Sequence, residues 1–231
     1  MKYMGSKNRI AKEILPIMLK LRGDRTWVEP FVGGGNMIDK VHGYRIGADI
    51  NHYVIDALIA IRDCVTDLPK NNSEFTEDDY KQLKKTDNYK YKGYAGFAFS
   101  YSGKWMGGWA RDGLNKRDYV NESYKNAVNQ SPLLQGVKLL NESYLDLQIP
   151  ENSLIYCDPP YEGTTKYKDD FNHAIFWQWC RDMAIKGHII FVSEYNAPDD
   201  FECVWQKQIV SSLTKDTGSK KAIEKLFTIK K

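Results

Sequence analysis

The chain has 231 residues, of which 42% are hydrophobic and 27% charged, and its formal net charge is only +3. A chain of this length and composition can bury a substantial core, so we expect a globular protein with one large domain, or one domain and a small insert. No long apolar stretch follows the first seven residues. This argues against a signal peptide and a membrane span, and it makes the cytoplasm the expected location.

The cysteines and histidines give no indication of a metal site. The four cysteines lie far apart and lack paired spacing, which argues against a zinc site and a disulfide framework, so we expect them to be reduced. The histidines show no ligand spacing either: His42, His52, His173 and His188.

The positive charge of the chain is segregated. The segment from Lys81 to Lys125 carries ten Lys and Arg against four Asp and Glu, a net charge of +6, so the remainder of the chain carries −3. A basic segment of this kind suits contacts with phosphate groups.

The first elements predicted along the chain are a helix and a short strand. Apolar residues recur at helical spacing from Ile10 to Leu21, although Pro16 should kink or shorten this helix. The strand Thr26–Val28 follows and leads into the glycine-rich segment Glu29–Gly35. Apolar residues within 37–41 indicate a second helix just beyond that segment.

Strands and helices continue to alternate in much of the remaining chain. The strand Tyr44–Ala48 ends at Asp49, and apolar residues from Val54 to Ile61 indicate the next helix. Later strands are indicated at Val137–Leu140, Leu154–Cys157 and Ile189–Val192, with a helix from Ile175 to Met183 between the last two. The closing strands, which we expect to be antiparallel, are Trp205–Val210 and Ala222–Ile229. This order predicts an α/β fold with a largely parallel sheet.

One long segment breaks the alternation. Residues 62–135 are polar and rich in Gly, Lys and Tyr. We therefore predict a discontinuous catalytic domain of residues 1–61 and 136–231, with residues 62–135 as an inserted recognition module.

The most informative motif is Asp158-Pro159-Pro160-Tyr161, directly behind the apolar run Leu154–Cys157. The two prolines fix φ and remove two backbone donors, so the chain must leave the sheet and the Pro159 carbonyl can accept from a ligand. Asp158 is a second acceptor, and Tyr161 can cover a planar ring. Because open α/β sheets bind ligands at the carboxyl ends of their strands, the motif predicts a pocket for methylating an amino group on a flat base. The alternative is a strand-terminating turn.

The glycine-rich segment and Asp49 predict a nucleoside site. Gly33, Gly34 and Gly35 let the backbone approach a ligand, and the next helix start would present free N–H groups. Their spacing differs from that of dinucleotide binders, so a tight structural turn is the alternative. Asp49 is placed to accept both hydroxyls of a ribose, unless it caps the following helix. A nucleoside beside a methyl acceptor indicates S-adenosylmethionine.

Together these motifs resemble the Dam-like D12 class of DNA N6-adenine methyltransferases, in its compact phage and bacterial form. Four motifs match in order, over nearly the whole chain: Tyr3–Lys7, Glu29–Gly35, Ala48–Asn51 and Asp158–Tyr161. Glu142-Ser143-Tyr144 also fits the family. The resemblance implies a Rossmann-like S-adenosylmethionine-dependent methyltransferase fold with a small inserted DNA-recognition module.

The resemblance also assigns cofactor-binding residues. Tyr3 and Lys7 are implied to line the cofactor pocket, Phe31 and Gly33–Gly35 to pack around the methionine moiety, and Asp49 to hold the ribose. Tyr144 is implied to border the cofactor adenine, and Asp158 is implied to serve the cofactor site as well as the target base. Without the family, Tyr3 and Lys7 would be interpreted as a disordered terminus and Phe31 as core.

The insert is rich in aromatic residues interleaved with basic ones, which suits base stacking and phosphate contacts. We expect Phe97, Phe99 and Trp109 to be core. The predicted DNA-facing loop is Ser100–Arg111, with Lys104, Trp105 and Arg111 as candidate DNA-binding residues. A solvated face is the alternative for the two charged residues. The loop departs from the longer, hairpin-bearing module of enzymes that methylate GATC, so no target sequence is implied.

Two later polar loops, Thr164–Lys168 and Lys215–Lys221, correspond to loops that flank DNA in related enzymes. We therefore add Lys166, Lys215 and Lys220 to the candidate DNA-binding residues. Plain surface loops are the alternative.

The function implied by the resemblance is site-specific methylation of N6 of an adenine flipped out of duplex DNA, with S-adenosylmethionine as donor and Asp158, Pro159, Pro160 and Tyr161 as catalytic residues. The alternatives are methylation of N4 of cytosine or of RNA adenine, and a non-catalytic DNA-binding protein on the same scaffold. The expected partner is double-stranded DNA. No metal is expected, and an associated restriction endonuclease is left open.

Overall fold

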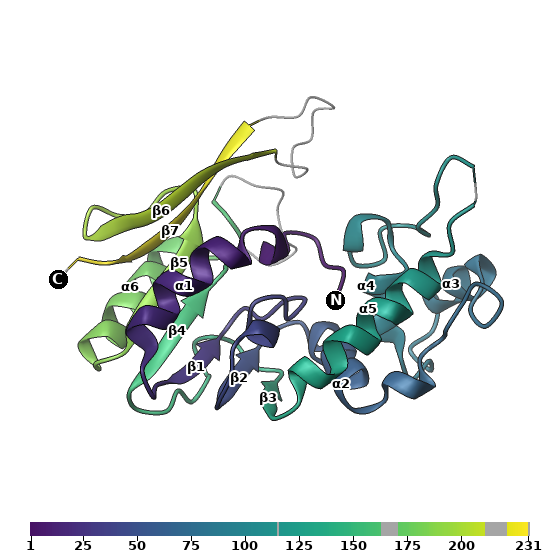
Figure 1. The fold of residues 1–231 in the computed structure, drawn as a ribbon, viewed down its shortest axis with the longest axis horizontal. Helices are drawn as coiled ribbons and strands as arrows, with labels where there is room; N and C mark the ends of the chain where they lie inside the picture. The colour runs from purple at the N-terminus through teal and green to yellow at the C-terminus, as the bar shows by residue number, and fades with distance from the viewer. Residues whose placement is uncertain (115, 163–170, 211–220, 231) are drawn as a thin grey trace.

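The structure, a computed structural model, describes residues 1–114, 116–162, 171–210 and 221–230. Within these residues seven strands form one sheet in the order β3-β2-β1-β4-β5-β7-β6 (Figure 1). The strands are β1 (Thr26–Glu29), β2 (Arg45–Ala48), β3 (Val137–Leu140), β4 (Ser153–Cys157), β5 (Ile189–Glu194), β6 (Phe201–Val210) and β7 (Lys221–Ile229).

Strands β1 to β5 are parallel, whereas β7 is antiparallel to both of its neighbours, β5 and β6. The predicted α/β fold, with its largely parallel sheet and closing antiparallel pair, is confirmed. Parallel strands place their carboxyl ends at one edge of the sheet. The segments that follow β1, β2 and β4 therefore meet at this edge.

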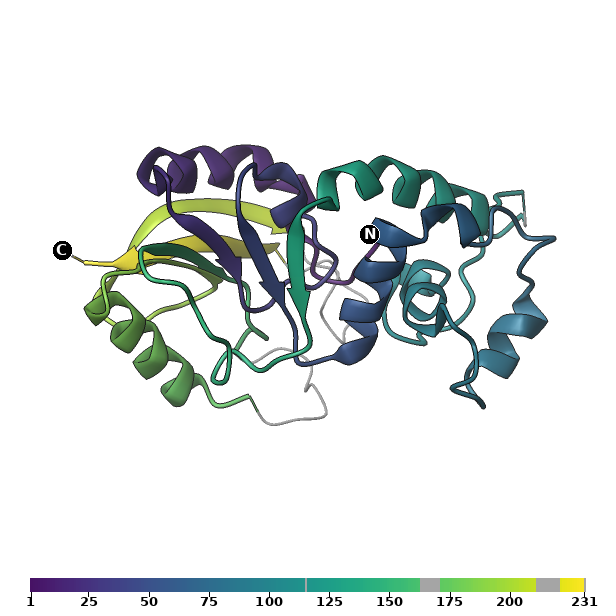
Figure 2. The same cartoon turned by 90° about the horizontal axis from the view of Figure 1, so that it is seen from below.

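Helices cover both faces of the sheet. α1 (Ala11–Arg22) lies on one face and α6 (His173–Ile185) on the other, as Figures 1 and 2 show together. Successive strand residues point to opposite faces. Trp27 and Tyr156 accordingly join the core on the α1 side, whereas Val28 and Ile155 pack on the α6 side.

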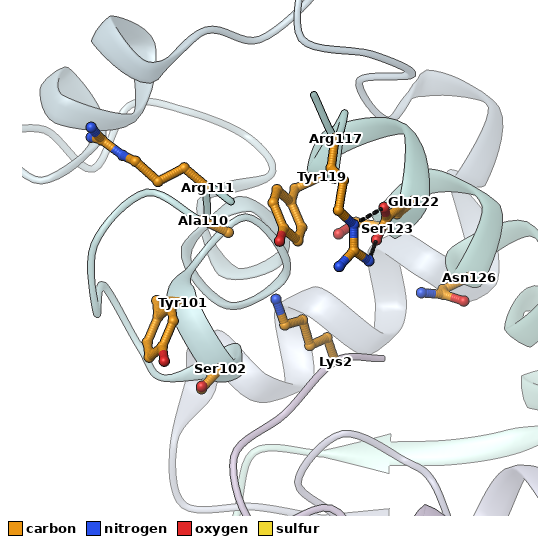
Figure 3. A pocket seen from close by; sticks show the side chains of 10 residues that line it. All are labelled: Lys2, Tyr101, Ser102, Ala110, Arg111, Arg117, Tyr119, Glu122, Ser123 and Asn126. Carbon is orange, nitrogen blue, oxygen red and sulfur yellow. Dashed lines mark hydrogen bonds and ion pairs between the residues drawn. The ribbon is translucent and has the colours of Figure 1, made fainter. Parts of the chain in front are cut away.

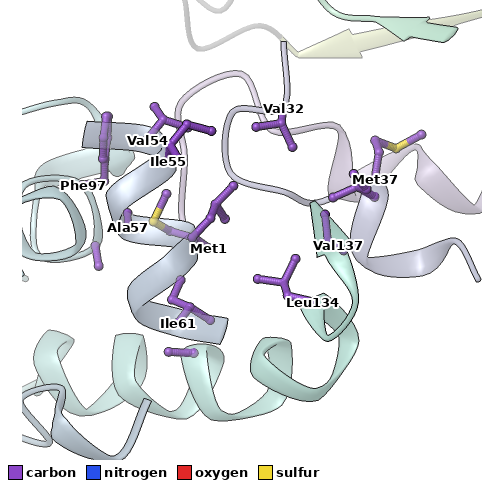
Figure 4. Packing of buried hydrophobic residues seen from close by; sticks show 14 of the residues in the cluster. Met1, Val32, Met37, Val54, Ile55, Ala57, Ile61, Phe97, Leu134 and Val137 are labelled. Carbon is purple, nitrogen blue, oxygen red and sulfur yellow. The ribbon is translucent and has the colours of Figure 1, made fainter. Parts of the chain in front are cut away.

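The segment predicted to be an insert lies at the β3 end of the sheet, beside α2 (His52–Asp63) (Figures 1 and 2). Its helices are α3 (Glu77–Leu83), α4 (Lys92–Ala98) and α5 (Tyr119–Leu134). Its apolar side chains share one core with the rest of the chain, because Phe97 and Leu134 cluster with Val32, Val54 and Ile61 (Figure 4). The insert is therefore held by burial of apolar surface.

One prediction about local structure was wrong. The helix expected within 37–41 is one 3₁₀ turn, Ile38–Lys40, and at Val41 the chain is already extended towards β2. The apolar residues in this segment are spaced as in a helix because they are buried in the core, not because the segment is helical. Of the two effects predicted for Pro16, kinking or shortening of the helix, shortening does not occur, because α1 continues to Arg22. Pro16 lies on the exposed side of that helix, where water can bind the carbonyl that its missing N–H leaves free.

We expect the replacement of Gly93 by alanine to destabilise the fold where α4 meets α2. A Cβ atom at Gly93 would lie 2.4 Å from the carbonyl oxygen of Tyr53 and 3.1 Å from the amide nitrogen of Ala57, both backbone atoms of α2. The helices must separate to admit it, at a cost of about 1–3 kcal/mol in the free energy of unfolding. Urea denaturation measures this difference.

The matched control is Gly113→Ala, because no atom lies within 4 Å of a Cβ placed there. Its free energy of unfolding should stay within about 0.5 kcal/mol of the wild type. If both variants unfold at the same urea concentration, the backbones of α2 and α4 are not in close contact.

Candidate functional site

The tetrapeptide Asp158–Tyr161 emerges from the carboxyl end of β4. All five residues of this strand are buried, and its neighbours are β1 and β5. Pro159 is buried, and within the described residues its carbonyl accepts no hydrogen bond. The Tyr161 ring meets Tyr195 edge-on, with centroids 4.7 Å apart. The Asp158 carboxylate, the Pro159 carbonyl and the Tyr161 ring, which were predicted as acceptors and stacking ring, therefore lie at the same strand end.

A lysine from the N-terminal segment reaches this acceptor. Lys7 Nζ lies 2.8 Å from Asp158 Oδ1 and 3.4 Å from Glu224 Oε1, and it sits over the Tyr161 ring at 4.7 Å from the centroid. The Tyr161 hydroxyl donates to the Glu224 carboxylate. Glu224 lies on β7, and only 4% of its side chain is exposed. One nitrogen thus contacts two carboxylates and an aromatic face.

The charges at this site are perturbed by burial. Desolvation raises the pKa of Asp158 to about 6, against the opposing effect of the Lys7 ammonium. Burial by itself would lower the pKa of Lys7, but Asp158 and Glu224 raise it. Lys7 is therefore protonated and forms ion pairs with Asp158 and Glu224.

Glu194, at the end of β5, holds the backbone beside the tetrapeptide. Its carboxylate accepts from the amides of Tyr195 (2.7 Å) and Glu162 (3.2 Å). Burial raises its pKa to about 8. Glu194 anchors the residue directly after Tyr161.

Asp49 and the glycine-rich segment meet at the carboxyl ends of β1 and β2. The Gly33 amide donates to Asp49 Oδ2 (3.1 Å), and the Asn51 amide donates to Asp49 Oδ1 (3.0 Å). Desolvation raises the pKa of Asp49 to about 6. The cap of α2 is Asn51, whose side chain accepts from the Tyr53 amide, so the capping interpretation of Asp49 was wrong. Each Asp49 oxygen keeps a lone pair for a ligand hydroxyl.

Tyr3 packs between the glycine-rich segment and the insert. A Cβ atom on Gly33 would lie 2.9 Å from the Tyr3 ring, and one on Gly34 would lie 2.6 Å from Tyr3 Cβ. On the other side, the Tyr3 and Phe97 ring centroids are 5.3 Å apart, and the Met4 amide donates to the Gly103 carbonyl (3.2 Å). The interpretation of this segment as disordered was wrong.

Phe31 and Tyr144 lie in one aromatic cluster beside the glycine-rich segment. Their centroids are 5.3 Å apart, and both rings pack against Phe171 and Phe176. Phe31 is only partly buried. The cluster can provide an apolar wall for a ligand.

Gln130, on α5, was not identified from the sequence. Its buried amide nitrogen donates to the Gly34 carbonyl (3.0 Å), the Gly35 carbonyl (3.3 Å) and Asp39 Oδ2 (2.9 Å). Gly35 has φ +67°, which favours glycine. The insert therefore helps to fix the glycine-rich segment, and no local motif signals this contact.

The candidate DNA-binding residues of the insert differ in their surroundings. Lys104 is exposed, and Arg111 is exposed but lies 2.6 Å from Glu77. Trp105 is partly buried and stacks on Tyr53 with centroids 4.2 Å apart. Phe97 and Phe99 are buried, and Trp109 packs on the same core. Three further candidates lie outside the described residues: Lys166, Lys215 and Lys220.

In the described part of the chain, no three His, Cys, Asp or Glu side chains are grouped so that they could hold a metal ion. None of the helices described combines the length and apolarity needed to cross a bilayer.

The strand order, with β7 antiparallel between β5 and β6, defines a Rossmann-like α/β fold. A sequence profile of the D12 class N6 adenine-specific DNA methyltransferases matches residues 3–99. The chain is similar to this family over that range, which is less than half of its length. The matched range includes Tyr3–Lys7, Glu29–Gly35 and Ala48–Asn51.

Individual relatives are distant. The chain is 25% identical over 216 residues to the type II methyltransferase M.FokI of Planomicrobium okeanokoites, covering 80% of this chain and 32% of that protein. It is 26% identical over 209 residues to the type II methyltransferase M.MjaIII of Methanocaldococcus jannaschii, covering 72% of this chain and 70% of that protein. The chain thus spans about a third of the first relative. Among solved structures, the Escherichia coli protein yhhF has a TM-score of 0.44 at 10% identity, covering 98% of this chain and 88% of that one.

Proposed function

We propose that the chain transfers a methyl group from S-adenosylmethionine to N6 of adenine at specific sites in duplex DNA. The observation that carries this proposal is the position of Lys7 Nζ, 2.8 Å from Asp158 and 4.7 Å from the centroid of Tyr161. A nitrogen donor at the position of Lys7 Nζ contacts the Asp158 carboxylate and the face of the Tyr161 ring at the same time. An exocyclic amine on a stacked base needs the same two contacts.

The residues at the neighbouring strand ends fit the cofactor. Asp49 has free lone pairs for ribose hydroxyls, the glycine-rich segment approaches closely, and Phe31 with Tyr144 supplies an apolar wall. S-adenosylmethionine supplies a methyl group on a positively charged sulfur. The chain's own residues therefore need only to bind, orient and stabilise charge.

Asp158 and the Pro159 carbonyl are proposed to accept the two N6 hydrogens while Tyr161 stacks on the base. Acceptance by Asp158 stabilises the positive charge that grows on N6 as the new N–C bond forms and the S–CH₃ bond of the donor breaks. The electron pair of that bond stays on sulfur, and the N6 proton then passes to solvent. The target base must first leave the duplex, at a cost of roughly a few kcal/mol, which stacking in the pocket helps to offset. Lys7 must release Asp158 at that moment, and Glu224 is its second carboxylate partner.

DNA is proposed to lie across the insert, with Lys104, Trp105 and Arg111 as contacts, and residues 62–135 are proposed as the recognition module. Binding through phosphates should weaken steeply as salt rises. The cytoplasm is the proposed location, since DNA is the proposed substrate. We make no proposal about a partner endonuclease.

Mass spectrometry of nucleosides tests this function directly. Purified protein is incubated with isotopically labelled S-adenosylmethionine and plasmid DNA, and the digested DNA should contain labelled N6-methyladenine. Labelled N4-methylcytosine, or label found only in RNA, would reassign the substrate. Cofactor binding without transfer to any nucleic acid would favour the non-catalytic scaffold.

A further inference from the structure

A polar cavity of about 320 Å³ lies in the insert, where the N-terminal segment passes the start of α5 (Figure 3). Its walls come from three stretches of chain: residue 2, residues 101–111 and the beginning of α5. The cavity is separate from the acceptor site at Asp158, because none of the residues of that site lines it. The charged side chains of the cavity are therefore not accounted for by the acceptor site.

The cavity contains a cation without a matched anion. Lys2 Nζ lies 5.3 Å from the centroid of the Tyr119 ring, and within the described residues it forms no ion pair or hydrogen bond. Arg117 lies 4.8 Å from the same ring and binds both oxygens of Glu122, at 2.8 and 2.7 Å. Two cations thus flank one ring while a single carboxylate, already bound by Arg117, lines the cavity. Arg111, at the rim, is paired with Glu77.

This arrangement favours a bound anion. Burial lowers the pKa of Lys2, and although Glu122 opposes this effect, the nearby Arg117 lowers the pKa further. A negative group beside Lys2 would reverse both unfavourable effects. Ser102 and Tyr101 line the cavity, and 67% of Tyr101 is exposed, so the cavity is accessible from solvent.

We propose that this cavity binds one phosphodiester group of the DNA backbone, with Lys2 as its main ligand and Arg117 as the second. The cavity is larger than a phosphate group, so it can also admit part of the attached sugar. Arginine and lysine are the usual partners of DNA phosphates, and such contacts position a protein on the duplex without reading sequence. The proposal rests on the proposed function only in taking DNA as the substrate.

The N-terminal segment gives this site a defined relation to the acceptor site. Lys2 lines the cavity, Tyr3 packs on the glycine-rich segment, and Lys7 contacts Asp158. Five residues of extended chain span at most about 18 Å. One DNA strand covers that length in about five nucleotides. With the reach of the two lysine side chains added, the phosphate held by Lys2 lies within roughly one helical turn of the target adenine.

Fluorescence anisotropy with a labelled duplex of mixed sequence tests the site on the full chain. Lys2→Met should weaken binding about tenfold at low salt, and it should reduce the slope of log K against log salt by about 0.9, the value for one lost phosphate contact. Lys2→Arg should restore both. Glu122→Gln should act in the opposite sense and tighten binding, because it removes the negative charge and frees Arg117.

The matched control is Lys20→Met, which removes the same charge from an exposed position on α1, outside the cavity. If Lys2→Met and Arg117→Met give the same affinity and salt slope as Lys20→Met, the proposal is wrong. Titration with inorganic phosphate separates the source of the anion. An effect of Lys2→Met confined to inorganic phosphate, with DNA affinity unchanged, also overturns the assignment to the DNA backbone.

This assay requires no methyl transfer. A reduced salt slope in Lys2→Met together with no labelled nucleoside would leave the phosphate site standing and refute the proposed function. Labelled N6-methyladenine together with an unchanged salt slope in Lys2→Met would support the proposed function and refute the phosphate site. Thermal unfolding of each variant verifies that the loss of affinity does not come from unfolding.

Discussion

Replacing Asp158 by alanine is expected to lower kcat/KM for DNA methylation by about 10³-fold or more, because the charge that develops on N6 then has no anionic acceptor. The variant should remain folded. Burial raises the pKa of Asp158 to about 6, because desolvation disfavours its ionised carboxylate in the folded state. Lys7 keeps Glu224 as a partner. The ratio of kcat/KM between wild type and variant is obtained from the transfer of labelled methyl groups at subsaturating DNA concentrations.

The control for this loss is Asp24→Ala, an exposed carboxylate in the turn between α1 and β1, at the opposite end of the strands from Asp158. It should keep wild-type turnover. Calorimetric titration with cofactor should show that Asp158→Ala still binds it. Near wild-type turnover in Asp158→Ala would remove this carboxylate from the mechanism.

Replacing Asp49 by alanine is expected to weaken cofactor binding by about 10- to 100-fold. A hydrogen bond to a charged group contributes about 1.5–3 kcal/mol, and the variant also leaves the Gly33 amide without its acceptor. Isothermal titration calorimetry at pH 8 without DNA measures this effect separately from DNA binding. An unchanged Kd would exclude Asp49 from the cofactor site.

The pH dependence of cofactor binding should report the same carboxylate. Burial raises the pKa of Asp49 from 3.8 to about 6, and only the ionised form accepts from both ribose hydroxyls. Affinity should therefore rise with pH through about 6 and level off above it. In Asp49→Asn the profile should be flat over this range. A wild-type profile without a step near pH 6 would contradict this assignment.

Folding stability should respond to the same group in the opposite direction. The folded state binds the Asp49 proton more tightly than the unfolded chain does, because its pKa is raised. The contribution of Asp49 to stability is therefore greatest below pH 4 and decreases as pH rises from about 4 to 6. Cofactor affinity and intrinsic stability thus change in opposite senses over one pH window.

Much of the sheet and of the segments at its strand ends could be predicted from sequence because the signals are local. Apolar runs marked the buried strand before Asp158, and the two prolines after it ended that strand. The glycine-rich segment and Asp49 follow adjacent parallel strands, so their proximity also follows from the predicted topology. The local pattern misled at Ile38, where apolar residues at helical spacing are buried but form only a 3₁₀ turn.

The sequence by itself determined the α/β fold, the place of Asp158–Tyr161 at the end of a buried strand, and the place of Asp49 beside the glycine-rich segment. Each of these depends on neighbours in the chain and on one rule for parallel strands. Only the tertiary structure brought Glu224 to Lys7, Gln130 to the glycine-rich segment, and Lys2 beside Arg117. These partners are separated by roughly a hundred residues or more, and none belongs to a local motif. Their proximity depends on the antiparallel placement of β7 and on the packing of the insert against the N-terminal segment, and spacing along the chain encodes neither.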